Sequence, residues 1–438
     1  MKPGRDHSAV ALAAVPLLFL GAFYFYPLFE IFSVSLTSDG TWGLRNIVNV
    51  FSAGYYARVL WFTTWQAALS TLLTLVLALP AAYVFARYRF PGKSLIQSLS
   101  AIPFVLPSVV VAAAFSALLG PRGLVNEWLM AIRGLESPPI RLEHTITFIL
   151  MAHVFYNFTV VLRIVGGFWS RIDPGLVQAA QVLGASPWQS FRKITLPLLR
   201  PGIMAASLLV FIFCFSSFGV ILILGGPRFA TIEVAVYRQA MHLFNLPMAA
   251  ALSLLQICFM FVFMWVYTRL QRAASVELTP EAGRIVQRDV ATVKDRLIVW
   301  GTVSFMLVLL AAPLLALAFR SLSTEGGLSL LYYRALFQNP SQSIFYIPPV
   351  SAIGYSVGYA AVALVMSLCI ALPAALFLSR DRGRATSLLD PLFMLPLATS
   401  SVTLGFGYII ALDEPPLNLR TSLLIVPLAH TLVAYPFV

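Results

Sequence analysis

Charged side chains are scarce in this sequence, and acidic ones are the scarcer kind. Only 11% of the 438 residues are Asp, Glu, Lys or Arg, whereas a soluble globular domain carries about 25%. Hydrophobic residues make up 59%, so the composition indicates an integral membrane protein. The 29 Lys and Arg against 17 Asp and Glu indicate basic loops that face anionic membrane lipid. No nucleic acid is expected as a partner, because no basic stretch alternates with aromatic residues.

Cysteine and histidine are also few, and neither forms a pattern that would hold a metal. The three cysteines, Cys214, Cys258 and Cys369, lie within apolar runs and show neither ligand spacing nor a disulfide framework. The five histidines are scattered along the chain. We therefore expect no metal site.

Catalytic and nucleotide-binding motifs are missing as well. The one Gly-Lys-Ser sequence, at residues 92–94, has Arg87 where a phosphate-binding loop needs its first glycine. No nucleophile–base or paired-carboxylate arrangement stands out. We therefore expect no catalytic residues and no cofactor bound by this chain.

Long apolar runs, by contrast, occupy most of the chain. Runs of about 20 apolar residues can cross a bilayer as helices and are far longer than a barrel strand. Nine complete runs and a tenth that is cut are Ala9–Ser33, Trp61–Ala86, Leu95–Leu119, Thr145–Val165, Ile203–Leu224, Ala249–Val266, Leu297–Phe319, Val357–Leu378, Pro391–Ala411 and Leu423–Val438. The expected fold class is an all-α polytopic membrane protein.

The basic residues predict the orientation of these runs, because Lys and Arg concentrate in cytoplasmic loops. With the N-terminus in the cytoplasm, the inner segments hold 19 of the 29 basic residues, including all four lysines. This orientation places Gly166–Arg200 and Arg269–Arg296 in the cytoplasm and Gly120–His144 outside. The expected location is the cell (inner) membrane, which the chain crosses many times.

A weak internal repeat underlies the order of the runs. Ala78-Leu79-Pro80-Ala81-Ala82 recurs as Ala371-Leu372-Pro373-Ala374-Ala375, and an Arg-x-Arg inner loop follows each copy. We interpret the chain as two tandem six-helix repeats. Residues 1–270 form the first, 271–296 a cytoplasmic linker, and 297–438 a second repeat that is incomplete and truncated in its fourth helix. The sequence is therefore expected to be part of a twelve-span protein.

A polar, basic island occupies residues 166–201, between two apolar runs. Asp173 can cap a helix N-terminus, with Pro174 at the first helical position. Gly184 suits the left-handed residue just past a helix end, and Ser186-Pro187 repeats the start signal. The island predicts a short helix, a turn and a second short helix.

The residues of this island resemble a known motif. Gln178-Ala179-Ala180, followed by Gly184-Ala185-Ser186-Pro187, Phe191 and the run Leu196–Ile203, is similar to the "EAA" loop of ABC-importer permeases. The resemblance implies the type I ABC importer permease fold, and it makes residues 166–201 a coupling loop that docks on an ATPase subunit. The family's leading Glu is Gln178 here, so a charged contact at that position would be neutral.

The resemblance also implies partners. A separate ABC ATPase homodimer would hold ATP and magnesium, an extracytoplasmic solute-binding protein would deliver the solute, and membrane lipid would surround the spans. The outer turn Leu224–Arg228, together with residues 213–218 and 235–237, resembles the fused permeases for thiamine and ferric iron. One of these solutes is therefore expected.

Two other classes of membrane protein remain open. Two parallel six-span halves also describe the major facilitator fold of secondary transporters. Ion coupling in such a transporter would require charged residues within the membrane, and nearly all charged residues of this chain lie in loops. A membrane prenyltransferase would need Asp-rich motifs for metal and diphosphate, and the sequence has none.

Polar side chains inside apolar runs are candidates for lining a solute pathway. His153 and Asn157, four residues apart, share one face of the fourth run, and His430 and Tyr435 lie in the tenth. Hydrogen bonding between helices is the alternative explanation for these residues.

Three further residues are pathway candidates because of their position. Pro103 and Pro107 break the third run, which predicts either a gate beside the pathway or kinked packing. Glu233 follows the outer turn and predicts contact with a cationic solute or with the binding protein, or else a solvated side chain.

Overall fold

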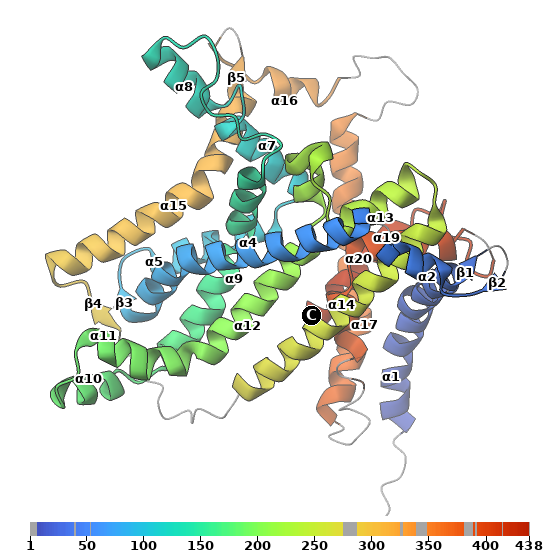
Figure 1. The fold of residues 1–438 in the computed structure, drawn as a ribbon, viewed down its shortest axis with the longest axis horizontal. Coiled ribbons are helices and arrows are strands. Elements are labelled where there is room, and N and C mark those ends of the chain that lie inside the picture. Colours follow the sequence, from blue (N-terminus) through green and yellow to red (C-terminus); the bar gives the residue numbers. More distant parts are fainter. Residues whose placement is uncertain are drawn as a thin grey trace, which may run out of the picture. The chain divides into compact units, whose positions relative to one another are not determined.

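The structure is a computed structural model that describes residues 7–38, 41–52, 54–274, 287–324, 327–338, 348–380, 389, 392–413 and 415–437 (Figure 1). The chain forms two compact units, and each unit draws on segments that are far apart in the sequence. Unit 1 contains Met1–Ala57, Ile232–Phe261 and Gly326–Val438, and unit 2 contains Arg58–Thr231 and Val262–Glu325.

Unit 2 is helical apart from short strands. Its helices, wholly or for most of their length, are α4 (Gly54–Arg87), α5 (Lys93–Leu99), α6 (Ile102–Val105), α7 (Ser108–Leu119), α8 (Leu124–Arg133), α9 (Ile146–Arg171), α10 (Pro174–Val182), α11 (Pro187–Ser190), η2 (Phe191–Thr195), α12 (Leu196–Phe215), η3 (Ile221–Gly225), η4 (Gly226–Arg228) and α15 (Val293–Leu322). Strand β3 (Tyr88–Arg89) pairs in parallel with β4 (Arg288–Asp289), and β5 covers Ser323–Thr324. Helix α9 packs against α12 and is the most buried of the described spans, so it forms the centre of this unit.

Unit 1 is also helical. Its elements are α1 (His7–Leu20), η1 (Gly21–Phe25), α2 (Tyr26–Leu36), β1 (Thr37–Ser38), β2 (Thr41–Trp42), α3 (Arg45–Ser52), α13 (Ile232–Met241), the first half of α14 (Leu246–Ala274), β6 (Gly327–Leu328), α16 (Leu331–Ala335), α17 (Pro349–Arg380), η6 (Leu395–Ala398), α19 (Ser401–Ala411), α20 (Ile425–Ala434) and η7 (Tyr435–Phe437). Strands β1 and β2 form an antiparallel pair. Helix α17 packs against both α1 and α20, and α19 packs against α2 and α13.

The core of unit 1 is apolar and closely packed. Phe19, Leu20 and Leu432 are among the buried side chains that join α1, α17, α19 and α20. Helix α19 approaches α2 closely at Gly407, where an added Cβ would lie 3.1 Å from side-chain atoms of Pro27 and Ile31. The absence of a side chain at this glycine therefore sets the spacing of the two helices.

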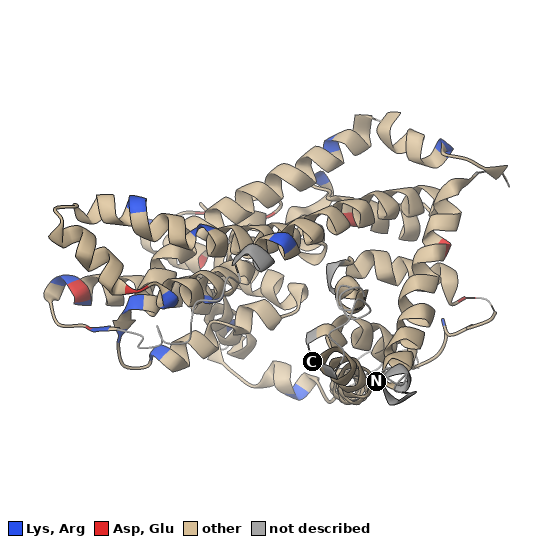
Figure 2. Cartoon of the chain, turned by 90° about the horizontal axis from the view of Figure 1, so that it is seen from below, with Lys and Arg blue, Asp and Glu red and all other residues tan. Residues whose placement is uncertain are grey.

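Eight helices within the described residues are long and apolar enough to cross a membrane. Figure 2 shows long stretches of ribbon without a charged residue, as spans require. The ninth and tenth expected runs contain the shorter apolar helices α19 and α20. The structure divides the expected run Leu95–Leu119 into α5, α6 and α7, which confirms the break predicted from its two prolines. The break coincides with Pro103 and Pro107, since proline removes a helical hydrogen bond and restricts the residue before it.

The proposed division into tandem repeats stays a prediction. Unit 1 combines helices from residues 1–270 with helices from residues 297–438. The two compact units therefore do not coincide with the two expected repeats. Much of the expected linker 271–296 lies outside the described residues.

Candidate functional site

The polar island folds as the sequence predicts. The carboxylate of Asp173 accepts a hydrogen bond from Gly175 N at 2.7 Å and caps α10, which begins at Pro174. Gly184 has φ +90°, the left-handed conformation that favours glycine. Helix α10, the turn and α11 therefore form one helix–turn–helix within residues 166–201, the segment that the resemblance makes the expected coupling loop.

A capping box holds the second helix of the coupling loop. Ser186 Oγ accepts from Gln189 N at 3.2 Å, and Gln189 Oε1 accepts from Ser186 N at 2.9 Å. Gln189 was not among the residues predicted from the sequence, although the Ser-x-x-Gln pattern is a recognised start signal. Helix α11 then continues through η2 into α12, so that Pro187–Phe215 forms one continuous helix. The coupling loop is thereby joined rigidly to a membrane span.

The coupling loop exposes apolar side chains. Val182 is 87% exposed, Leu183 88% and Trp188 68%, and Gln178 and Ala179 beside them are also exposed. The loop lies between two candidate spans, and exposed apolar groups on such a connecting segment mark a protein–protein or a membrane interaction site.

The base of the coupling loop is anchored to neighbouring helices of unit 2. The ring of Phe191 stacks on Trp188 with centroids 5.7 Å apart and on Trp169 at 6.4 Å. Arg87, at the end of α4, donates from Nη1 to the carbonyl of Ile172 at 3.2 Å. These contacts hold the loop against α4 and α9 while its tip stays exposed.

His153 lies at the centre of a hydrogen-bonded chain between helices of unit 2. Its Nδ1 lies 2.8 Å from Ser70 Oγ, and its Nε2 lies 2.9 Å from Ser217 Oγ. Asn157 donates to the His153 carbonyl at 2.9 Å and lies 3.5 Å from Cys214 Sγ. Both side chains are buried. This geometry favours hydrogen bonding between helices over an open pathway at these two residues.

The partners of His153 were not recognised in the sequence, although a signal exists. Gln66, Ser70 and Thr74 follow one another at four-residue spacing in α4 and are all buried. Such spacing places them on one face of the helix. A polar stripe within an apolar run therefore indicates a buried hydrogen-bonded face.

Glu233 is not solvated. It is 1% exposed and lies in the first turn of α13, within unit 1. Its Oε1 accepts from Gln256 Nε2 at 2.6 Å, and its Oε2 accepts from Ser400 Oγ. Ser400 also caps α19 by accepting from Thr403 N at 3.2 Å. Glu233 thus joins three helices of unit 1.

Comparison with known proteins shows which family the chain resembles. Residues 74–276, which include the whole coupling loop, match the family model for "Binding-protein-dependent transport system inner membrane component". The chain is 28% identical over 385 residues to the thiamine transport system permease protein ThiP of Brucella abortus (strain 2308), covering 87% of this chain and 68% of the relative. It is 27% identical over 399 residues to ThiP of Escherichia coli (strain K12), covering 89% and 70%. Over most of its length the chain is similar to the permease subunits of ABC importers.

Two further likenesses agree with this assignment. A putative 2-aminoethylphosphonate transport system permease protein of Salmonella choleraesuis (strain SC-B67) is 26% identical over 257 residues, which cover 58% of this chain and 90% of that protein. The fold is similar to a chain in the crystal structure of a bacterial alginate ABC transporter in complex with an alginate pentasaccharide-bound periplasmic protein. The TM-score is 0.50 at 21% identity, covering 62% of this chain and 96% of the other. The helical importer-permease fold expected from the coupling loop is confirmed.

Side chains of α9 donate hydrogen bonds to backbone carbonyls at the proline break between α5 and α7. Tyr156 donates to the carbonyl of Leu106 at 3.0 Å, and Thr159 donates to the carbonyl of Ser100. Pro107 directly precedes α7, whose first residue is Ser108. Backbone carbonyls at the break are thus satisfied within the protein, as the apolar interior of a membrane requires.

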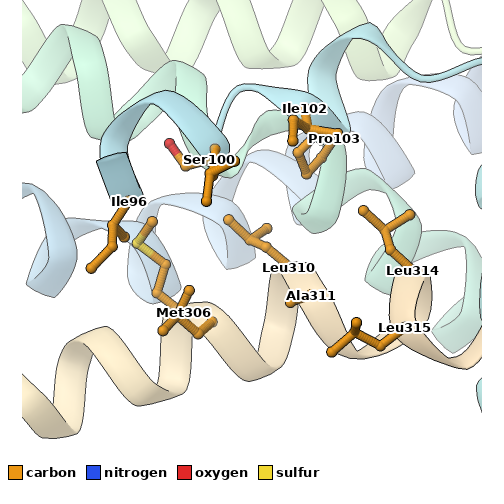
Figure 3. A pocket seen from close by; sticks show the side chains of 11 residues that line it. Ile96, Ser100, Ile102, Pro103, Met306, Leu310, Ala311, Leu314 and Leu315 are labelled. Atoms are coloured by element: carbon orange, nitrogen blue, oxygen red, sulfur yellow. The ribbon is translucent and has the colours of Figure 1, made fainter. Parts of the chain in front are cut away.

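Pro103 also borders a cavity of about 220 Å³ in unit 2. Figure 3 shows side chains from α5 and α6 facing side chains of α15 across it. The lining residues are Ile96, Leu99, Ser100, Ile102, Pro103, Met306, Leu307, Leu310, Ala311, Leu314 and Leu315. The walls are almost entirely apolar, which suits a hydrocarbon chain better than a polar solute.

The structure does not place His430 and Tyr435 in one environment. Both belong to the C-terminal helical segment, but His430 is exposed. Tyr435 is buried, donates to the Phe393 carbonyl and packs edge-on against Phe19.

The described residues contain no cluster of three or more His, Cys, Asp or Glu able to hold a metal ion.

Proposed function

We propose that this permease passes thiamine from an extracytoplasmic solute-binding protein to the cytoplasm, driven by a separate ATPase dimer that binds ATP and magnesium. The solute assignment is supported by the two thiamine permeases above, each matched over more than two thirds of its length. The sequence is compatible with either ferric iron or thiamine as the solute, and the names of these relatives favour thiamine. The binding-protein partner is supported by the family description.

The observation that carries the ATPase contact is the exposed apolar tip of the coupling loop. Val182, Leu183 and Trp188 lie at or beside the Gly184 turn, and each is more than 60% exposed. Tryptophan is enriched among the residues that contribute most of the binding energy at protein interfaces, and the apolar contacts around such an anchor exclude water. ATP-driven closure of the ATPases would then pull on α12 through the continuous helix Pro187–Phe215.

The proposed orientation puts the coupling loop and the N-terminus in the cytoplasm. The support is the distribution of basic residues, because the inner segments hold 19 of the 29 Lys and Arg. The ATPase would meet the permease on this side, and the binding protein would meet it on the other.

Uptake by the reconstituted transporter tests this function against the alternative of a secondary transporter. The permease, its ATPase and its binding protein are placed in liposomes with radiolabelled thiamine outside and ATP inside. We expect accumulation that requires ATP and survives an ionophore that collapses ion gradients. Accumulation without ATP that the ionophore abolishes would favour a secondary transporter instead.

A competition assay in the same liposomes tests the solute. Excess unlabelled thiamine should abolish uptake of the label, whereas excess 2-aminoethylphosphonate should leave it unchanged. Equal competition by the phosphonate would contradict the thiamine assignment.

A further inference from the structure

Within the part of the chain that the structure describes, the buried acid Glu233 has no basic partner. Both of its oxygens accept hydrogen bonds from neutral groups, the amide of Gln256 and the hydroxyl of Ser400. Among the described residues, the ion pairs join Arg320 to Glu127 and Arg420 to Asp413, and neither involves Glu233. An ionised carboxylate removed from water is costly unless an opposite charge compensates it.

The two segments that contact Glu233 carry oxygen atoms that have no hydrogen-bond partner among the described residues. The Oε1 atom of Gln256, whose amide nitrogen contacts the carboxylate, is buried and unpartnered, as are Ser253 Oγ and Thr403 Oγ1. All three residues are at most 1% exposed. A buried oxygen left without a donor is unfavourable, but the same oxygen can serve as a ligand for a cation.

Helical spacing brings these oxygens to the same two helix faces as the partners of Glu233. Ser253 and Gln256 are three residues apart on α14, and Ser400 and Thr403 are three residues apart at the start of α19. Residues at this spacing are neighbours on a helix surface. Two oxygen-bearing faces therefore flank one carboxylate, all within unit 1.

We propose that Glu233, with the side-chain oxygens of Gln256, Ser253 and Thr403, forms a binding site for a single positive charge. Carboxylate and neutral oxygen ligands are the donors that hard cations prefer. The cation is either a free alkali ion or the positively charged group of the transported solute. Both offer the same chemistry, a monovalent cation, and the solute alternative rests on the proposed function.

A purely structural role would require a different set of contacts. A latch between α13 and α19 would need only the hydrogen bond between Glu233 and Ser400, and a neutral side chain could make it. The unpartnered oxygens of Gln256, Ser253 and Thr403 have no use in such a latch. A bound cation would compensate the charge and give these oxygens a partner.

Thermal unfolding of the purified transporter complex measures this binding directly. Tm is recorded in N-methylglucamine chloride and after replacement, at constant ionic strength, by sodium chloride, potassium chloride or thiamine. A ligand that binds the folded protein raises Tm increasingly with concentration. We expect this rise for the wild type and for E136Q, which removes an exposed carboxylate, and no rise for E233Q.

The outcomes separate the source of the cation. A rise that depends on Glu233 with sodium or potassium identifies an alkali-ion site, and one with thiamine identifies the solute. A concentration-dependent rise of equal size in E233Q, or no rise in the wild type, would overturn the proposal. If thiamine is taken up but no cation raises Tm, the proposed function is supported and the cation site is not. If sodium raises Tm but thiamine is not taken up, the cation site is supported and the proposed function is not.

Carbodiimide labelling of the wild type covers the case in which E233Q fails to fold. Dicyclohexylcarbodiimide modifies carboxyl groups in apolar surroundings, and mass spectrometry locates the product. We expect modification of Glu233 in N-methylglucamine buffer and protection by the cation that raises Tm. Failure of every cation to protect, or absence of modification in that buffer, would count against the site.

Discussion

At the scale of single residues, Gly184 determines the turn of the coupling loop. Its φ of +90° lies in the left-handed region, yet an added Cβ would meet no atom within 4 Å. A side chain there would therefore strain the backbone without a steric clash. Gly167, near the end of α9, has equally open surroundings but no positive φ.

We predict that G184A reduces ATP-driven uptake while G167A does not. A non-glycine residue in the left-handed conformation costs roughly 1–2 kcal/mol, which lowers the population of the native turn by a factor of about 5–30. The measurement is thiamine uptake by the reconstituted transporter, with the amount of permease in the membrane as the control. Equal uptake by the two variants would show that the turn geometry is not needed for coupling.

His153 gives a second prediction at this scale. In H153L the hydroxyls of Ser70 and Ser217 lose their ring partners. Ser70 is buried, and a buried group left unsatisfied costs about 1–3 kcal/mol. We expect a lower Tm of the purified permease, whereas H430L, at an exposed histidine, leaves Tm unchanged. A normal Tm combined with lost uptake would instead favour a pathway role for His153.

At the scale of elements, the coupling loop combines an exposed tip with a rigid connection. Helix α11, η2 and α12 follow one another without a break, and the capping box at Ser186 fixes where this helix begins. A force on the tip would therefore reach the membrane span directly. The tip itself contributes little to folding, because its apolar side chains are exposed.

We predict that the double variant V182S/L183S weakens the association of permease and ATPase without lowering Tm. Both side chains are nearly fully exposed, so their loss removes contact area from a partner and none from the core. The measurement is the amount of ATPase that copurifies with the permease. The control is L328S, at an exposed leucine in the short strand β6. Unchanged copurification would indicate that the ATPase binds elsewhere.

At the scale of the whole molecule, the predicted orientation links these elements to the two sides of the membrane. It places the coupling loop in the cytoplasm and residues 120–144 outside. Gln181 in α10 and Ser137 in the segment after α8 are both exposed, so each can report the side on which it lies.

Single-cysteine labelling with a membrane-impermeant reagent tests this orientation. Cys214, Cys258 and Cys369 are first replaced by alanine, and Q181C or S137C is then introduced. We expect S137C to react in intact cells and Q181C to react only after permeabilisation. The reverse pattern would invert the topology and place the coupling loop on the outer side.

The sequence by itself determined the features that depend on local chemistry. Helical spans follow from apolar runs too long to be anything else in a membrane. The coupling loop follows from Asp173, Gly184 and Ser186, because capping and left-handed turns need only neighbouring residues. The break of the third run likewise follows from Pro103 and Pro107, because proline cannot continue a helix through its own backbone nitrogen.

Only the tertiary structure decided which residues meet across helices. An apolar run does not specify which other run it faces, because most side chains on its surface offer similar packing. The sequence therefore could not show that His153 contacts Ser70 and Ser217, or that Glu233 contacts Gln256 and Ser400. Nor could it show that α1 packs against α17 within one compact unit. These contacts join residues far apart in the chain, and they form only when the helices have taken their places.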